Sequence, residues 1–186
     1  MITYRCFRND DPPRLAEVWR TADLGPLAMQ PMTTAELEAG VFSKPYFDRR
    51  GLIVATENNQ IVGFAHAGFG PTADQKGIDT RVGSTLLAVV PPHALENEIS
   101  DQLLVRCENY LLESGATCLL GGGNDVCRGF YLGLYGGSDL PGILDSSPKM
   151  QQVFERAGYR QQQRITVHRR PLEGFRVPVN RLHIAI

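Results

Sequence analysis

The sequence has no run of apolar residues long enough to cross a membrane. A spanning helix needs about 20 consecutive apolar residues, and no stretch of the 186 residues approaches that length. The opening residues, MITYRCFRND, also lack the apolar core of a secretory signal peptide. We therefore expect a cytoplasmic protein with no membrane partner.

The sequence also lacks an excess of charge of either sign. It has 19 Lys and Arg residues against 20 Asp and Glu residues, which leaves a net charge of −1. Proteins that bind nucleic acid usually carry a strongly basic surface, so we expect no nucleic-acid partner. The content of 42% hydrophobic and 21% charged residues argues against a disordered or fibrous chain, and the length favours one domain over residues 1–186.

The four cysteines are not spaced as metal ligands. No two of them form a C-x-x-C pair, which argues against the common zinc sites, and we predict no metal. Cys6, Cys107 and Cys118 lie inside apolar patterns, where a buried free thiol is expected. Cys127 lies in a predicted loop with no base beside it in sequence, so we do not expect a nucleophile there.

Apolar periodicity and turn residues predict an alternation of strands and helices. Asn58-Asn59 fits a two-residue hairpin turn because asparagine tolerates a positive φ. The polar segment 68–83 reads as a loop, and the glycine-rich segment 121–137 as an aromatic loop over a cleft. Strands are predicted at 2–7, 51–57, 61–67, 84–90, 117–120, 164–169 and 177–186, and helices after Pro12-Pro13, from Thr33 or Thr34, after an Asn97 cap, and around Lys149.

The most informative stretch is 86–116, LLAVVPPHALENEISDQLLVRCENYLLESGA. It reads as a buried strand, a break at Pro91-Pro92, and one long amphipathic helix that ends at Gly115. If this helix is a crossover, strand 117–120 must run parallel to strand 84–90. Helix N-termini that follow a strand are common anion sites, because unpaired N–H groups and the positive end of the helix dipole meet there.

These motifs resemble those of the GCN5-related N-acetyltransferase (GNAT) superfamily. The resemblance rests on LAVVPP at 87–92, on Leu103-Leu104 in the long helix, on Gly115, and on VFERAGY at 153–159, which is similar to the family's F-Y-E-K-x-G-F ending. It covers Tyr4 to about Arg170. It implies an α/β (α+β) fold with a mixed, mostly antiparallel central sheet, helices on both faces and a splayed central strand pair.

The resemblance also implies that acetyl-CoA is a substrate. In such proteins the pantetheine arm lies between the splayed strands, and the diphosphate rests on amides of the loop that opens the long helix. The acetyl-CoA-binding residues implied in this sequence are Ala88, Val89, Val90, Leu95, Asn97, Glu98, Ile99, Ser100 and Asn124.

The diphosphate loop departs from the family's R/Q-x-x-G-x-G/A pattern. Leu95 replaces the Arg or Gln, Glu98 replaces the first glycine, and Ser100 replaces the last small residue. A side chain at a glycine position obstructs the close approach of phosphate. A carboxylate at about 6 Å from one phosphate charge costs roughly 3 kcal/mol at an effective dielectric constant of 20.

The position of the general acid also differs from the family's pattern. Phe154 stands where the family often has a tyrosine that reprotonates the CoA thiolate, and phenylalanine has no proton to give. Tyr131 or Tyr135 could replace it. As general base the sequence offers Glu57, and also two histidines. These are His66, in the predicted hairpin, and His93, after the central strand.

Three functions therefore stand as hypotheses. The first is acetyl transfer from acetyl-CoA to a primary amine of a small molecule or peptide. The second is a catalytically silent binding or interaction module that has lost ordinary CoA binding, and the third is transfer from an acyl donor without the CoA diphosphate. The chain could be one half of a tandem protein beside a partner domain, or a homodimer formed through a terminal strand such as Leu182–Ile186.

Overall fold

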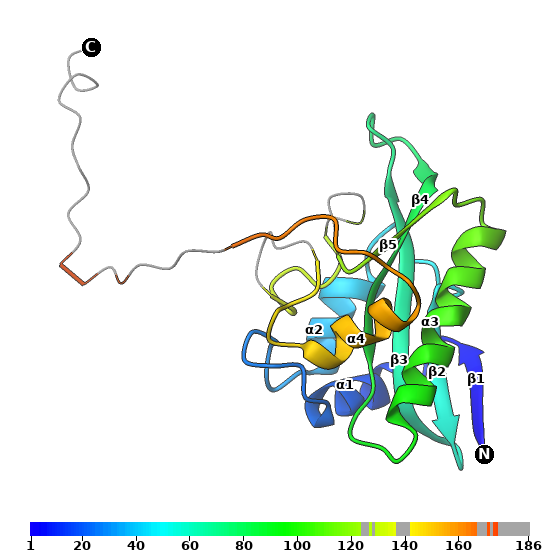
Figure 1. Cartoon of the computed structure of the whole chain (residues 1–186), viewed down its shortest axis with the longest axis vertical. Coiled ribbons are helices and arrows are strands. Elements are labelled where there is room, and N and C mark those ends of the chain that lie inside the picture. The colour runs from blue at the N-terminus through cyan, green and yellow to red at the C-terminus, as the bar shows by residue number, and fades with distance from the viewer. Residues whose placement is uncertain (124–126, 128, 137–141, 167–170, 172, 175–186) are drawn as a thin grey trace.

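The computed structural model describes residues 1–123, 127, 129–136, 142–166, 171 and 173–174. In this part of the chain five strands form one sheet in the order β1-β2-β3-β4-β5 (Figure 1). The pairs from β1 to β4 are antiparallel, and β5 runs parallel to β4. The strands are β1 (Ile2–Cys6), β2 (Leu52–Glu57), β3 (Gln60–Pro71), β4 (Ile78–Val89) and β5 (Cys118–Gly121).

Helices cover both faces of the sheet, as predicted (Figure 1). α3 (Glu96–Glu113) lies on one face, and α1 (Pro12–Thr21), α2 (Thr34–Leu37) and α4 (Pro148–Arg156) lie on the other. α2 continues into a π-helical turn, η1 (Glu38–Phe42). The sheet therefore separates two apolar clusters, and neighbouring residues of β3 point into different ones, as the pleat of a strand requires.

Local signals explain several of these boundaries. α1 begins at Pro12, since proline is tolerated in the first turn of a helix. Thr33 forms a capping box, because its hydroxyl accepts from Glu36 N and its own N–H donates to the Glu36 carboxylate. Asn58 and Asn59 have φ of 49° and 65°, which confirms the predicted hairpin turn.

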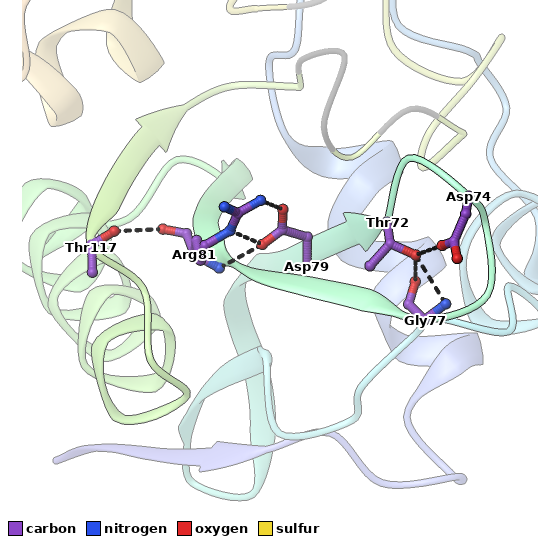
Figure 2. Close-up of polar contacts among 6 residues, drawn as sticks. All are labelled: Thr72, Asp74, Gly77, Asp79, Arg81 and Thr117. Carbon is purple, nitrogen blue, oxygen red and sulfur yellow. Dashed lines mark hydrogen bonds and ion pairs between the residues drawn. The ribbon is translucent and has the colours of Figure 1, made fainter.

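The predicted loop at 68–83 is wrong over most of its length. β3 extends to Pro71 and β4 begins at Ile78, with Gly70 opposite Asp79. Figure 2 shows how the polar residues of this segment satisfy one another. Thr72 donates to Asp74 at 2.6 Å, and Arg81 pairs with the Asp79 carboxylate at 2.6 Å. Glycines and bulges hide the alternation by which a strand is recognised in sequence.

Three further boundaries differ from expectation or stay untested. α3 has Leu95 as its N-cap residue and not Asn97, because Glu96 already takes a helical position and Ile99 N donates to Leu95 O. The predicted strand 164–169 is not formed in its described part, 164–166. The predicted strand 177–186, with the proposed dimer edge, lies outside the described residues.

A buried ion pair connects β1 to α1. The Asp11 carboxylate is 1% exposed and accepts two hydrogen bonds of 2.7 Å from the Arg5 guanidinium. A third hydrogen bond of 2.7 Å comes from Arg8 N. Burial raises the pKa of Asp11, but the hydrogen bonds from Arg5 and Arg8 outweigh it and hold this pKa below its ordinary value.

We expect Asp11→Ala to lower the free energy of unfolding by about 2 kcal/mol, because it leaves the Arg5 guanidinium and Arg8 N without their acceptor. The stabilisation from a lowered carboxyl pKa is present above the unfolded pKa and is lost as the pH falls through the folded pKa. The difference between the two proteins should therefore shrink in acid. Urea unfolding, followed by the fluorescence of Trp19, measures it. The exposed neighbour Asp10→Ala is the control, and equal losses in both variants would contradict the prediction.

Candidate functional site

β4 and β5 separate part-way along β4 and form a fork. They pair from Val82 with Cys118 to Thr85 with Gly121. Gly122 N still donates to Thr85 O at 2.8 Å. Residues 86–89 of β4 have no partner in β5, although residues 87–89 keep their pairing with β3. This is the splayed central strand pair that was predicted.

The apex of the fork carries a glycine against an aromatic ring. Phe154 of α4 is 3% exposed and packs on Gly121. A Cβ on Gly121 would lie 2.7 Å from Cδ1 of Phe154, so only glycine fits there. At the same level the Thr85 hydroxyl is buried and has no hydrogen-bond partner among the described residues. The apex thus combines a close apolar contact with an unsatisfied polar atom.

A hollow of about 500 Å³ lies where the free arm of β4 leads into α3. It is lined by residues 93–98 and by Lys149 and Gln152 of α4. In the first turn of α3, Ile99 N donates to Leu95 O, but the amides of Asn97 and Glu98 make no hydrogen bond to another described residue. The residues that line the hollow therefore include two whose backbone amides have no partner among the described residues, and one lysine.

Two ion pairs join α3 to α4 beside this hollow. Lys149 Nζ lies 2.7 Å from the Glu96 carboxylate, and Arg156 Nη2 lies 2.6 Å from Asp101 Oδ1. The carboxylates of Glu96 and Asp101 are thus balanced by α4. Glu98 has no ion-pair partner in the described part of the chain. One acidic side chain of the loop remains uncompensated.

His93 connects the hollow to the end of β2. Its Nδ1 accepts from Leu95 N at 3.0 Å, so the proton of the neutral ring is on Nε2, which donates to Glu57 Oε2 at 3.3 Å. Glu57 lies at the hairpin turn, and about six residues of β3, or roughly 20 Å, separate this turn from the level of the fork apex. Glu57 orients His93 and is far from the apex.

A second polar pair lies on the other side of β3, under the face covered by α1. His66 is opposite Leu87 in the free arm of β4, and its Nδ1 is 3.0 Å from the Tyr131 hydroxyl. Phe47, Phe130 and Tyr131 surround the imidazole edge to face. Burial lowers the pKa of His66 to about 3, with an opposing contribution from Asp48, and raises the pKa of Tyr131. Both groups are therefore neutral near pH 7.

The segment 129–136 forms the cover of this pair. Its backbone is held by hydrogen bonds from Tyr131 N to Gly40 O, from Met29 N to Leu134 O and from Gly136 N to Leu27 O. Tyr131 has a φ of 56°, which is unusual for a residue with a side chain, and its ring stacks on Trp19. The predicted aromatic loop is thus packed against α1 and η1.

The described residues contain no group of three or more His, Cys, Asp or Glu side chains that could hold a metal. No helix in the same residues is long and apolar enough to span a bilayer.

No protein-family model and no curated protein matches the sequence. Solved structures do match. An aminoglycoside N-acetyltransferase, AAC(6')-Iy in complex with CoA, aligns with 91% of this chain and 95% of its own at a TM-score of 0.60 and 12% identity. A protein described as an acetyltransferase of the GNAT family from Desulfovibrio desulfuricans aligns with 88% of this chain and 87% of its own, at a TM-score of 0.56 and 15% identity. A transcriptional regulator from Bacillus halodurans C-125 aligns with 90% of this chain and 99% of its own, at a TM-score of 0.57 and 16% identity.

The chain has the GNAT fold. Identities this low show the fold and not the reaction. The GNAT resemblance predicted from the motifs at 87–92 and 153–159 is confirmed at the level of the fold.

The residues predicted for acetyl-CoA, apart from Asn124, lie in three places on this GNAT fold. Leu95, Asn97 and Glu98 are exposed at the hollow, and Ala88, Val89 and Val90 lie at the end of the free arm. Ile99 and Ser100 are buried, and the Ser100 hydroxyl donates to Glu96 O at 2.8 Å. Asn124 lies outside the described residues.

The three residues predicted to be catalytic are not brought together. Glu57 lies at the hairpin turn, Tyr131 beside His66, and the Tyr135 hydroxyl 3.9 Å from Met150 Sδ. Nothing in the sequence indicated the ion pair of Lys149 with Glu96 or the pairing of His66 with Tyr131. Neither has a local signal, because the partners are 53 and 65 residues apart.

We expect the buried imidazole to make stability depend on pH. The unfolded pKa of histidine is about 6.5, and that of His66 in the fold is about 3. A lowered pKa gives stability that is complete above the unfolded pKa and is lost as the pH falls from about 6.5 towards 3. Between pH 7 and 5 the free energy of unfolding should fall by about 2 kcal/mol more in the wild type than in His66→Gln. Parallel pH dependences in urea unfolding would refute this.

Proposed function

We propose that the protein is an acetyltransferase that moves an acetyl group from acetyl-CoA to a primary amine. The observation that carries this proposal is the continuity of the site: the fork, its free β4 arm and the hollow at the start of α3 follow one another along the chain. The aminoglycoside acetyltransferase of the same fold has been solved with CoA. In this chain the fork, the free arm and the hollow together suit an extended donor with an anionic end.

The residues present fit such a donor. Its thioester would lie near the fork apex, where the unpaired Thr85 hydroxyl offers a polar partner. The diphosphate would lie in the hollow, where the amides of Asn97 and Glu98 and the ammonium of Lys149 can donate to it. Lys149 would exchange the Glu96 carboxylate for phosphate. Lys149 compensates Glu96 in this loop, whereas the Glu98 carboxylate would still oppose the diphosphate.

The chemistry requires little beyond positioning. The amine attacks the thioester carbonyl, and backbone donors along the free arm of β4 can polarise the carbonyl oxygen. Phe154 at the apex supplies packing and no proton. The acceptor class that we propose first is an aminoglycoside or another small polyamine, with peptide amines as the next class.

The silent module is the second candidate, and two observations favour it. Phe154 fills the apex, and segment 129–136 closes the face over His66. The fold also occurs in a transcriptional regulator. Donor binding separates the two candidates. Homodimer formation and a tandem partner domain stay predictions from the sequence.

We expect acetyl-CoA to bind with micromolar affinity and Lys149→Ala to weaken binding about tenfold, because one charge-assisted contact to phosphate is lost. Glu96→Gln should strengthen binding, since it removes the carboxylate that competes for Lys149. Isothermal titration measures both. The control is Lys76→Ala, because Lys76 lies at the exposed β3–β4 turn away from the hollow.

No heat with millimolar acetyl-CoA would exclude the donor and support the silent module. Equal affinities of wild type and Lys149→Ala would instead place the diphosphate elsewhere. Release of the CoA thiol in the presence of an aminoglycoside panel then tests transfer itself.

A further inference from the structure

His66 is a buried polar group whose partners are incomplete. It is 0% exposed, and its Nδ1 meets the Tyr131 hydroxyl at 3.0 Å. Its Nε2 has no hydrogen-bond partner among the described residues. Such an atom costs stability, and folded proteins seldom keep one without a use. The position of the ring is also specific, because His66 lies opposite Leu87 in the arm of β4 that borders the fork.

The residue of β3 that lies beside Nε2 is a glycine, Gly68. A carbon placed at the Cβ position of Gly68 would lie 4.0 Å from His66 Nε2 and 3.5 Å from Phe130 Cε2, which are ordinary contact distances. Gly68 is two residues further along β3 than His66, and the direction in which its side chain would point leads to the imidazole. An alanine at position 68 would therefore place its methyl group in contact with Nε2 and with the Phe130 ring.

We propose that His66 is a catalytic residue of the acyl transfer, whose Nε2 takes the proton of the attacking amine, and that Tyr131 is the residue that positions it. This inference rests on the proposed function. The amine nitrogen bonds to the thioester carbon, the C–S bond breaks, and the amine proton passes to Nε2. The same proton then goes to the thiolate sulfur, so the products are an amide and the CoA thiol, and His66 returns to its neutral form.

The role requires one tautomer of the ring. Nε2 can accept a proton only if the proton of the neutral imidazole is on Nδ1, which then donates to the Tyr131 oxygen. The same hydrogen bond survives when the ring becomes doubly protonated. Tyr131 therefore keeps the orientation of the ring in both states and does not itself give up a proton, which differs from the general-acid role predicted for it.

The base must be uncovered before it acts. The amine reaches Nε2 only when segment 129–136 is displaced from Gly40 and from residues 27–29. In the covered state burial keeps the pKa of His66 far below 7, and contact with water returns it towards its ordinary value. The other titratable groups near the ring are Tyr131, Asp48 and Cys127, whose Sγ is 3.4 Å from Gly68 O.

The first test needs no turnover. Nitrogen chemical shifts of the His66 ring in ¹⁵N-labelled protein distinguish the two tautomers. We expect the Nδ1–H form, and an Nε2–H form would overturn the proposal. Trp19, the single tryptophan, stacks on Tyr131 with 6.0 Å between ring centroids. Its emission should therefore change when an aminoglycoside is added to the acetyl-CoA complex, and unchanged emission would contradict the uncovering.

The second test is kinetic. His66→Asn keeps an amide at the level of Nδ1 and removes Nε2, and we expect kcat to fall by about 100-fold or more while acetyl-CoA affinity stays within about twofold. Tyr131→Phe should lower kcat about tenfold with KM unchanged. Gly68→Ala, which places a methyl group in contact with Nε2, should also lower kcat. Tyr4→Phe on β1, where the ring packs against Arg106 and not against His66, is the matched control and should keep kcat.

The outcomes separate this inference from the proposed function. If the wild type neither binds acetyl-CoA nor transfers acetyl groups, the proposed function fails and the inference with it. If it does both and His66→Asn is as fast as the wild type, only the inference fails. Thermal unfolding checks that each variant is folded. Should His66→Asn be unfolded, an unchanged kcat in both Gly68→Ala and Tyr131→Phe would overturn the inference.

Discussion

The separation of β5 from β4 after Thr85 is the constraint on which the rest of the site depends. Up to that point β4 is a central strand with a partner on each side. Beyond it the arm has only β3, and buried backbone groups without partners are costly. Phe154 packs on Gly121, the last residue of β5, at the apex of the fork. The arm ends at the turn that opens α3, so the fork also determines where the hollow lies.

The electrostatics of the hollow follow from the same arrangement. Beside the hollow α4 lies against α3, and its Lys149 and Arg156 reach Glu96 and Asp101. Exposed ion pairs of this kind contribute only about 0–1 kcal/mol each. A phosphate could therefore recruit Lys149 at little cost. Glu96, one acidic residue of the loop, keeps this lysine at the site, whereas Glu98 has no ion-pair partner among the described residues.

How much of the fold and of the candidate site could be predicted from the sequence depends on how far apart in the sequence the interacting residues lie. The helix start at Thr33, the Asn58-Asn59 turn and the crossover helix depend on neighbours in sequence or on family motifs, and these predictions were confirmed. The loop 68–83 was misjudged because its polar residues bond to one another within a hairpin. The Lys149–Glu96 and His66–Tyr131 contacts depend on how α4 and segment 129–136 pack, and no local pattern reports that packing.

The replacement of tyrosine by Phe154 bears on the mechanism as a whole. Tyr131 is committed to His66, and the Tyr135 hydroxyl meets Met150, so neither phenol has an established route to a thiolate at the apex. A transferase built this way needs one group that removes the amine proton and then returns it to sulfur. An imidazole suits both steps because its ordinary pKa lies near neutrality. The proposed role of His66 as a single proton carrier on β3 would account both for the absence of a hydroxyl on Phe154 and for the unpaired Nε2.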